Sequence, residues 1–328
     1  MRVQLLRRTS AALSPIALVL ALVAPGATAN DATAHLGIGG LELVYNSAIA
    51  VVSEDLYVSP DEVRVAYRFR NITKAPVTST VAFPLPALDA TYYEDLWLDL
   101  ADPDGENYVN FRVWVDGAEV FPSVYSRVSA LGVDRTDAVR AAGLPLNPAA
   151  YTMGDALAAL APQTIEELHR LGLLVVEEWG IQPAWQFETA FYWEMTFPVG
   201  EDVIVEHNYK PVVGYGFFGD FQFDDPTYRA DYCMVESFIA AARRLMGADA
   251  DFAMLDERRI QYLLTPAANW ASPIGTFHLT VDKGDENALV SFCGTGVTKT
   301  SPTTFELTAT DFYPTEELNI LIVDAINN

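Results

Sequence analysis

The stretch Phe187–Phe197, with the sequence FETAFYWEMTF, carries the dominant structural signal of the chain. Apolar or aromatic side chains, with Thr189 among them, occupy every second position. The positions between them are Glu188, Ala190, Tyr192, Glu194 and Thr196. Because successive side chains of a β-strand point to opposite faces of a sheet, this period of two predicts a strand with one face in a core and the other in water.

The same alternation recurs on both sides of this stretch. It covers Val63–Arg70 and Phe277–Val281, and shorter segments with strand composition lie between turn signals such as Asp116-Gly117 and Lys283-Gly284. Further strands are expected at Ile49–Val58, Val77–Phe83, Asn110–Val115, Val203–Tyr209, Ile260–Leu264, Leu289–Phe292, Phe305–Thr310 and Leu318–Val323. Many short strands separated by turns are typical of antiparallel sandwiches.

The middle of the chain does not alternate. It is rich in Ala and Leu, and it predicts helices at Thr136–Ala142, Met153–Ala161 and Thr164–Leu171, the last followed by Gly172 as a stop. A further helix is expected at Glu236–Met246. The fold class is therefore mainly β, with two antiparallel β-sandwich-like units and a helical insertion between them.

The predicted domains follow from this division. Residues 1–29 are a signal peptide, 30–125 an N-terminal β unit, 126–183 the helical insertion, and 184–328 a C-terminal β unit with one helix. Each unit is expected to have its own core. The first core is expected to hold Val65, Tyr67, Phe69, Phe111 and Val113, and the second Phe191, Trp193, Phe197, Phe277 and Leu279.

The first 29 residues have the three parts of a secretory signal peptide. Arg2, Arg7 and Arg8 precede the apolar stretch Ile16–Val23, and the small residues Ala27-Thr28-Ala29 follow. The apolar stretch is shorter than the ~20 residues that a membrane helix needs. We therefore expect cleavage before Asn30 and an exported protein, either periplasmic or extracellular. An uncleaved anchor or a buried helix is the alternative.

Charge and cysteine content limit the partners and the compartment. Without residues 1–29, the chain has 17 Lys and Arg against 44 Asp and Glu, a net charge of −27. Such a surface repels phosphate backbones and anionic headgroups, so nucleic acid is not an expected partner. Cys233 and Cys293 are the only cysteines, and an even number in an exported chain favours one disulfide. The alternatives are two free thiols or half of a metal site.

The sequence carries no recognisable catalytic or cofactor motif. It contains no H-E-x-x-H, G-x-S-x-G, S-x-x-K, P-loop or G-x-G-x-x-G, and no two histidines stand at metal-ligand spacing. His207 shares a strand face with apolar residues and is interpreted as structural. No cofactor, metal or catalytic residue is therefore predicted. We expect a non-enzymatic binding or scaffolding protein whose partner is another envelope protein or a glycan, with a hydrolase of dispersed site residues as the alternative.

An aromatic and acidic segment, Gly214–Tyr232, is the most suggestive for ligand binding. Aromatic rings can stack on a ligand, and carboxylates can bind hydroxyls or a cation. The residues of this predicted ligand loop are Tyr215, Phe217, Phe218, Asp220, Phe221, Phe223, Asp224 and Asp225. The alternative is a structural hairpin whose rings close the second core.

Several segments resemble a known family of secreted bacterial proteins. They include Ser53–Pro60, Val63–Asn71, Val81–Pro84, Val205–Pro211 and Val290–Gly294, and shorter matches extend over nearly all of the chain after residue 29. This pattern resembles the domain-of-unknown-function 4424 family. The resemblance implies an exported, envelope-associated protein and supplies no activity and no catalytic residue. The strand that runs into Asn71, followed by Phe83–Pro86, is also similar, at the level of fold alone, to the β-sandwich modules at the front of vault and inter-alpha-trypsin-type proteins.

Overall fold

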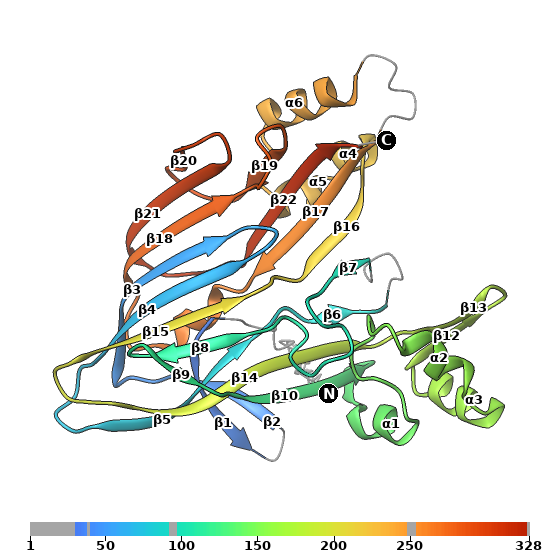
Figure 1. The fold of residues 1–328 in the computed structure, drawn as a ribbon, viewed down its shortest axis with the longest axis horizontal. Coiled ribbons are helices and arrows are strands. Elements are labelled where there is room, and N and C mark those ends of the chain that lie inside the picture. Colours follow the sequence, from blue (N-terminus) through green and yellow to red (C-terminus); the bar gives the residue numbers. More distant parts are fainter. Residues whose placement is uncertain (1–29, 38–39, 92–96, 248–253, 327–328) are drawn as a thin grey trace, which may run out of the picture.

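A computed structural model describes residues 30–37, 40–91, 97–247 and 254–326 (Figure 1). The predicted signal peptide, residues 1–29, lies outside the described residues. The described chain is mainly β, as predicted, with three larger sheets, a separate hairpin and a small number of helices.

An eight-stranded sheet contains strands from both halves of the chain. Its order is β20-β21-β18-β3-β4-β15-β8-β9, and its neighbours are antiparallel except for the parallel pair β18 and β3. The strands are β3 (Ile49–Val58), β4 (Val63–Asn71), β8 (Arg112–Val115), β9 (Ala118–Val120), β15 (Asp202–Tyr209), β18 (Ile274–Asp282), β20 (Thr298–Lys299) and β21 (Thr304–Phe312).

A seven-stranded sheet packs against this one. Its order is β11-β10-β14-β5-β1-β2, with β6 paired to β14. The strands are β1 (Ala32–Gly37), β2 (Gly40–Val44), β5 (Val77–Pro84), β6 (Leu88–Asp89), β10 (Ser123–Ala130), β11 (Val133–Asp134) and β14 (Gln186–Phe197). The alternating stretch Phe187–Phe197 belongs to β14, which lies between β10 and β5 in this sheet.

A five-stranded sheet, β19-β22-β17-β16-β7, forms the upper part of the molecule in Figure 1, beside α6. Its strands are β7 (Leu98–Asp99), β16 (Val213–Phe218), β17 (Leu255–Tyr262), β19 (Leu289–Phe292) and β22 (Leu318–Ala325). The hairpin is β12 (Leu174–Glu177) with β13 (Gly180–Pro183). The helices are α1 (Thr136–Ala141), α2 (Met153–Ala158), α3 (Pro162–Arg170), α4 (Asp220–Asp224), α5 (Pro226–Asp231), α6 (Glu236–Met246) and the 3₁₀ helix η3 (Thr265–Asn269).

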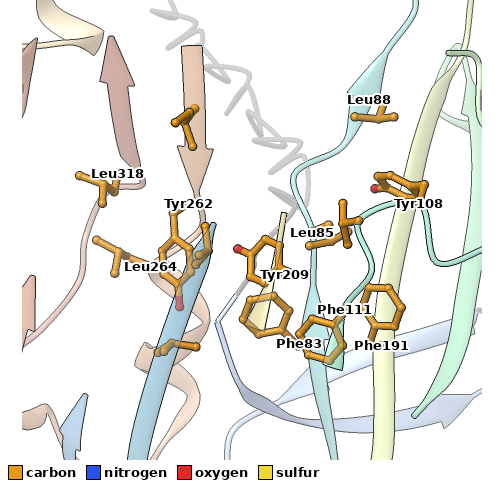
Figure 2. Packing of buried hydrophobic residues seen from close by; sticks show 14 of the residues in the cluster. Phe83, Leu85, Leu88, Tyr108, Phe111, Phe191, Tyr209, Tyr262, Leu264 and Leu318 are labelled. Carbon is orange, nitrogen blue, oxygen red and sulfur yellow. The ribbon is translucent and has the colours of Figure 1, made fainter. Parts of the chain in front are cut away.

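Aromatic rings fill the space between the sheets. In Figure 2, Phe83, Phe111 and Phe191 form one group and Tyr262 lies across from it, with Tyr209 between them. The ring centroids of Phe111 and Phe191 are 4.4 Å apart and nearly parallel, and those of Phe83 and Phe111 are 5.0 Å apart. Offset stacks of this kind add about 0.5–1.5 kcal/mol to the hydrophobic burial.

The ten residues expected in two separate cores are all buried, but they lie in one continuous hydrophobic cluster. The expectation of one core for each β unit is therefore wrong. The reason is strand pairing, because β4 from the first predicted unit pairs with β15 from the second, and β3 pairs with β18. The exact boundaries at residues 125 and 184 stay a prediction.

A smaller second cluster lies beneath the helices on the five-stranded sheet. It is built around Phe218, Phe223, Phe238, Leu321 and Val323. Strand β22 serves both clusters, since Leu321 and Val323 face this one while Ile320 and Ile322 face the larger one. Because both faces of the strand are buried, its sequence contains a continuous run of apolar residues.

A β-bulge in β3 changes which residues face the core. The pairing with β4 shifts register between Val51 and Ser53. Val51 is therefore buried, and so is Glu54, although they are three positions apart. A regular strand would place these two side chains on opposite faces. The extra residue of the bulge brings them to the same face.

Candidate functional site

The open face of the eight-stranded sheet carries polar side chains in rows that cross the strands. One row runs through His278, Asp55, Ala66, Glu206 and Trp114, each in register with the next. The small side chain at its centre leaves the sheet hollowed between two carboxylates. Since neighbouring strands lie about 4.8 Å apart, the backbones of the two acids are separated by about 10 Å.

The adjacent row runs through Thr280, Tyr57, Arg64, Asn208 and Arg112. The Arg64 guanidinium lies 4.2 Å from the centroid of the Tyr57 ring, and the Arg112 guanidinium lies 4.8 Å from that of Trp114 in the first row. Cation–π contacts of this kind hold both aromatic rings in place.

Members of the two rows line a groove of about 560 Å³, with Gly117 at its rim. Gly117 and Asp116 form the two-residue turn between β8 and β9, and both have positive φ angles, 78° and 50°. Asp-Gly at this place is the sequence signal of a type I′ hairpin. The predicted turn thus positions the rim of the groove.

Some polar groups of the groove are already paired. The Tyr57 hydroxyl donates a hydrogen bond to Asp282 (3.2 Å), Arg64 lies 3.4 Å from Glu62, and His278 Nδ1 lies 3.3 Å from Asp55. Partial burial, reinforced by the neighbouring Asp282 carboxylate, raises the pKa of Tyr57. Among the described residues, the Glu206 side chain has no hydrogen-bond or ion-pair partner, and it is exposed.

The groove therefore combines three kinds of binding group. Asp55 and Glu206 supply acceptors, Arg64 supplies donors, and Asn208 supplies both. Tyr57 and Trp114 add aromatic surface beside them. This set can hydrogen-bond several hydroxyl groups at once, and its opposite charges partly cancel.

A second concentration of polar groups lies inside the core and is closed to solvent. We call it the buried polar cluster, and its members are Asn30, Asp31, Glu54, Tyr67, His207 and Tyr262. His207 Nε2 lies 3.1 Å from Asp31 Oδ2, and both side chains are fully buried. Burial raises the pKa of Asp31, opposed by the His207 imidazole. His207 thus has the structural environment that its place in the strand predicted.

The predicted ligand loop is divided between the core and the surface. Phe218 and Phe223 are 0% and 1% exposed and belong to the second hydrophobic cluster, whereas Phe217 and Phe221 are 52% and 79% exposed. The segment forms β16, α4 and α5 rather than a hairpin. A ligand role for its exposed rings stays a prediction.

The acids of this segment have separate structural surroundings. Asp225 caps α5 by accepting hydrogen bonds from the backbone N–H groups of Thr227 (2.8 Å) and Tyr228 (3.2 Å). Asp220 lies in the first turn of α4, where a negative charge suits the helix dipole, and Asp224 is exposed. The role of Asp225 as a cap was not anticipated, although Asp before Pro226 is a recognisable helix-start signal.

Cys233 and Cys293 form a disulfide in the structure. The bond joins the segment between α5 and α6 to the residue that follows β19. The Ser291 hydroxyl donates to the carbonyl of Tyr232 (2.9 Å) at the same place. The bond therefore fastens the helical cover of the second cluster to the five-stranded sheet.

Metal-binding clusters and membrane-spanning helices are both absent from the described residues. No group of three or more His, Cys, Asp and Glu side chains there is arranged to hold a metal ion. No helix in the described ranges is long and apolar enough to cross a membrane.

Comparison with known proteins identifies a family but no activity. The family model described as "Domain of unknown function (DUF4424)" matches residues 29–321. The curated proteins include no match to the chain.

Two solved structures illustrate the similarities in three dimensions. A protein from Legionella pneumophila, provisionally named a nutrient binding protein, is 13% identical, with a TM-score of 0.44 over 90% of this chain and 70% of that chain. An M1 zinc metallopeptidase from Deinococcus radiodurans is 10% identical, with a TM-score of 0.28 over 85% of this chain and 43% of that chain. At these scores neither similarity indicates a shared activity.

Neither the groove nor the buried polar cluster was anticipated from the sequence. The signal for the groove is Ala66, the small residue between Arg64 and Arg68 on the polar face of an alternating strand. The signal for the cluster is Glu54 within the apolar β3 segment. To predict either feature, one must know the register of neighbouring strands, which sequence patterns do not specify.

Proposed function

Because the chain belongs to the DUF4424 family, whose description carries no activity, we propose a function from the groove: the protein is an exported, non-enzymatic binding protein that holds a neutral glycan across the open face of its eight-stranded sheet. The observation that carries the proposal is the hollow at Ala66 between two outward carboxylates, with aromatic rings beside it.

The chemistry of the groove favours hydroxyl groups over charged ligands. A sugar hydroxyl both donates and accepts, so it can satisfy Glu206, Arg64 and Asn208 together. Anionic ligands are disfavoured because the whole chain has a net charge of −24. The exposed Glu206 carboxylate, without a partner among the described residues, is available for such a contact.

A binding role is favoured over hydrolysis by the location of the unusual acids. Burial raises the pKa values of Asp31, Glu54, Glu257 and Asp324, and none of these four acids lines the groove. General acids in glycoside hydrolysis need a raised pKa and contact with the substrate. A hydrolase with dispersed site residues is the second candidate function. Release of reducing sugar from a bound oligosaccharide would indicate it.

Export is supported by the disulfide as well as by residues 1–29. Disulfides persist in oxidising compartments outside the cytosol. The Cys233–Cys293 bond agrees with that setting. We place the protein in the periplasm or outside the cell.

The test is a glycan array probed with the protein that starts at Asn30. We expect binding to neutral oligosaccharides. Ala66→Trp fills the hollow and should abolish binding, while Thr310→Trp, on the same open face in β21, should leave binding unchanged. Glu206→Gln should raise the dissociation constant by about 5- to 150-fold, because it removes about 1–3 kcal/mol of charged hydrogen bonding.

Two results would contradict the proposal. One is that no glycan binds the wild-type protein more tightly than it binds the Ala66→Trp variant. The other is release of reducing sugar from a bound oligosaccharide at a rate that falls with Glu206→Gln, which would assign a hydrolase to the groove. Glu206 is exposed and Ala66 is half-buried on the open face, so both variants should stay folded, and the melting temperature of each checks this.

A further inference from the structure

The beginning of the described chain is part of the core. Asn30 and Asp31 are both 0% exposed, although the first residues of a domain are ordinarily at its surface. The Trp270 indole donates to the Asp31 carbonyl (2.6 Å), and β1 then pairs with β5 and β2. These contacts fix the position of Asn30 from its C-terminal side.

Glu54 lies against Asn30. The Asn30 side-chain amide lies 3.4 and 3.3 Å from the two Glu54 carboxylate oxygens and 3.4 Å from the Leu264 carbonyl. The Tyr262 hydroxyl lies 3.5 Å from Glu54 Oε1 and 2.8 Å from the Tyr67 hydroxyl, which in turn donates to the Asn30 side-chain oxygen. Every one of these partners is neutral.

The charges in this region do not balance. Glu54 is 1% exposed, and no lysine or arginine of the described residues lies within ion-pair distance of it. The other charged groups of the cluster are Asp31, which has the same sign, and His207, whose Nε2 is bonded to Asp31. Burial, with a smaller contribution from Asp31, raises the pKa of Glu54 to about 8.

An unpaired buried carboxylate is one of the costliest features a core can contain. It implies either that Glu54 carries a proton or that a cation reaches it. The described side chains provide no such cation, but the backbone nitrogen of Asn30 becomes one if the chain is cut before this residue.

We propose that cleavage between Ala29 and Asn30 creates an α-ammonium group that becomes the buried ionic partner of Glu54. Hydrolysis by a leader-processing peptidase adds water across the peptide bond, so Ala29 leaves with a carboxylate and the Asn30 nitrogen becomes NH₃⁺. The freed terminus belongs to the residue whose side chain already contacts the Glu54 carboxylate, so the new charge forms beside the buried acid. The inference concerns the processing site and does not depend on what the groove binds.

Cleavage therefore supplies the counter-charge that the buried Glu54 carboxylate lacks. The precursor, whose Asn30 nitrogen is an uncharged amide, has a buried acid without a counter-charge, whereas the processed chain has a matched pair. Extra residues before Asn30 should also be harmful, since each moves the ammonium group by up to about 3.5 Å.

A double-mutant cycle tests the pairing. Four proteins are compared: the chain that starts at Asn30, the same chain with Gly-Ser added before Asn30, and both with Glu54→Gln. We expect the extension to lower the melting temperature by about 5–15 °C when Glu54 is present, and by less than a third of that with Glu54→Gln. An equal loss in both backgrounds would overturn the pairing.

Two mass measurements keep the test informative if a Glu54→Gln protein does not fold. The intact mass of the protein exported from the full-length gene should correspond to a chain that begins at Asn30, and another start overturns the cleavage site. The α-amine of the native protein should react with acetic anhydride at least tenfold more slowly than after unfolding. A native amine as reactive as an exposed one would overturn its burial.

Discussion

Ala66 and Tyr67 are neighbours in β4 that face opposite sides of one sheet. Ala66 faces outward and forms the hollow of the groove, whereas Tyr67 faces inward and belongs to the buried polar cluster. The period of two that predicts the strand also separates the two features. A change at one of these positions should therefore leave the other feature intact.

The pKa of Glu54 gives a prediction for pH dependence in the chain extended by Gly-Ser. Its folded value of about 8 lies above the ordinary value of 4.5, so the folded chain holds the proton more tightly than the unfolded chain. Stability from this group is complete below about pH 4.5 and is lost as the pH rises to about 8. We expect the melting temperature of the extended chain to fall across this range relative to its Glu54→Gln form.

The chain that starts at Asn30 is the control for this prediction. Its α-ammonium group favours the ionised carboxylate, so the pKa of Glu54 should be lower and the fall with pH smaller. Melting curves of all three proteins at pH 5, 6.5 and 8 make the comparison. Parallel curves for the two Glu54-containing chains would contradict the account.

At the scale of elements, the strands and helices that show a clear pattern within one segment were predicted well. Alternation identified β4, β14, β15 and β18, and the helices α1, α2, α3 and α6 agree with the predicted ones. Two kinds of feature were missed, one set by contacts between segments and one too short to show a pattern. The bulge in β3 is set by its partner strand, and α4 and α5 were hidden because short helices have little periodicity.

Strand β16 offers a matched pair of substitutions, because Phe217 and Phe218 are adjacent and face opposite sides. Phe218 is fully buried in the second cluster, so Phe218→Ala should destabilise the protein by about 3–5 kcal/mol. Phe217 is half-exposed, with a ring contact to Trp97, so Phe217→Ala should cost about 1 kcal/mol or less. Denaturant unfolding measures both, and equal losses would show that the strand faces were assigned wrongly.

At the scale of the whole molecule, the sequence predicted two cores and the structure contains one main core. Local patterns show that a strand has an apolar face but do not show which strands will share a sheet. Here β4 and β15 are more than 130 positions apart and pair over their full length. Pairing between distant segments, together with the groove that depends on it, is the part of the fold that sequence patterns leave open.

A shared core predicts cooperative unfolding. Phe69 comes from the first predicted unit and Trp193 from the second, and each should cost about 3–5 kcal/mol when replaced by Ala. Both variants should shift one and the same transition, followed in denaturant by tryptophan fluorescence and by far-ultraviolet circular dichroism. Tyr151→Ala, at an exposed position of the insertion, is the control and should leave the midpoint unchanged.

Two separable transitions would contradict the shared core. In that case Phe69→Ala would shift one transition and Trp193→Ala the other, as two independent units require.

A crystal structure of the protein with the oligosaccharide that gives the strongest array signal will show whether the open face of the eight-stranded sheet binds a glycan. We expect sugar density above Ala66, with hydroxyl groups within hydrogen-bond distance of Asp55 and Glu206. Density at the exposed rings of Trp97 and Phe217, with the groove empty, would contradict it.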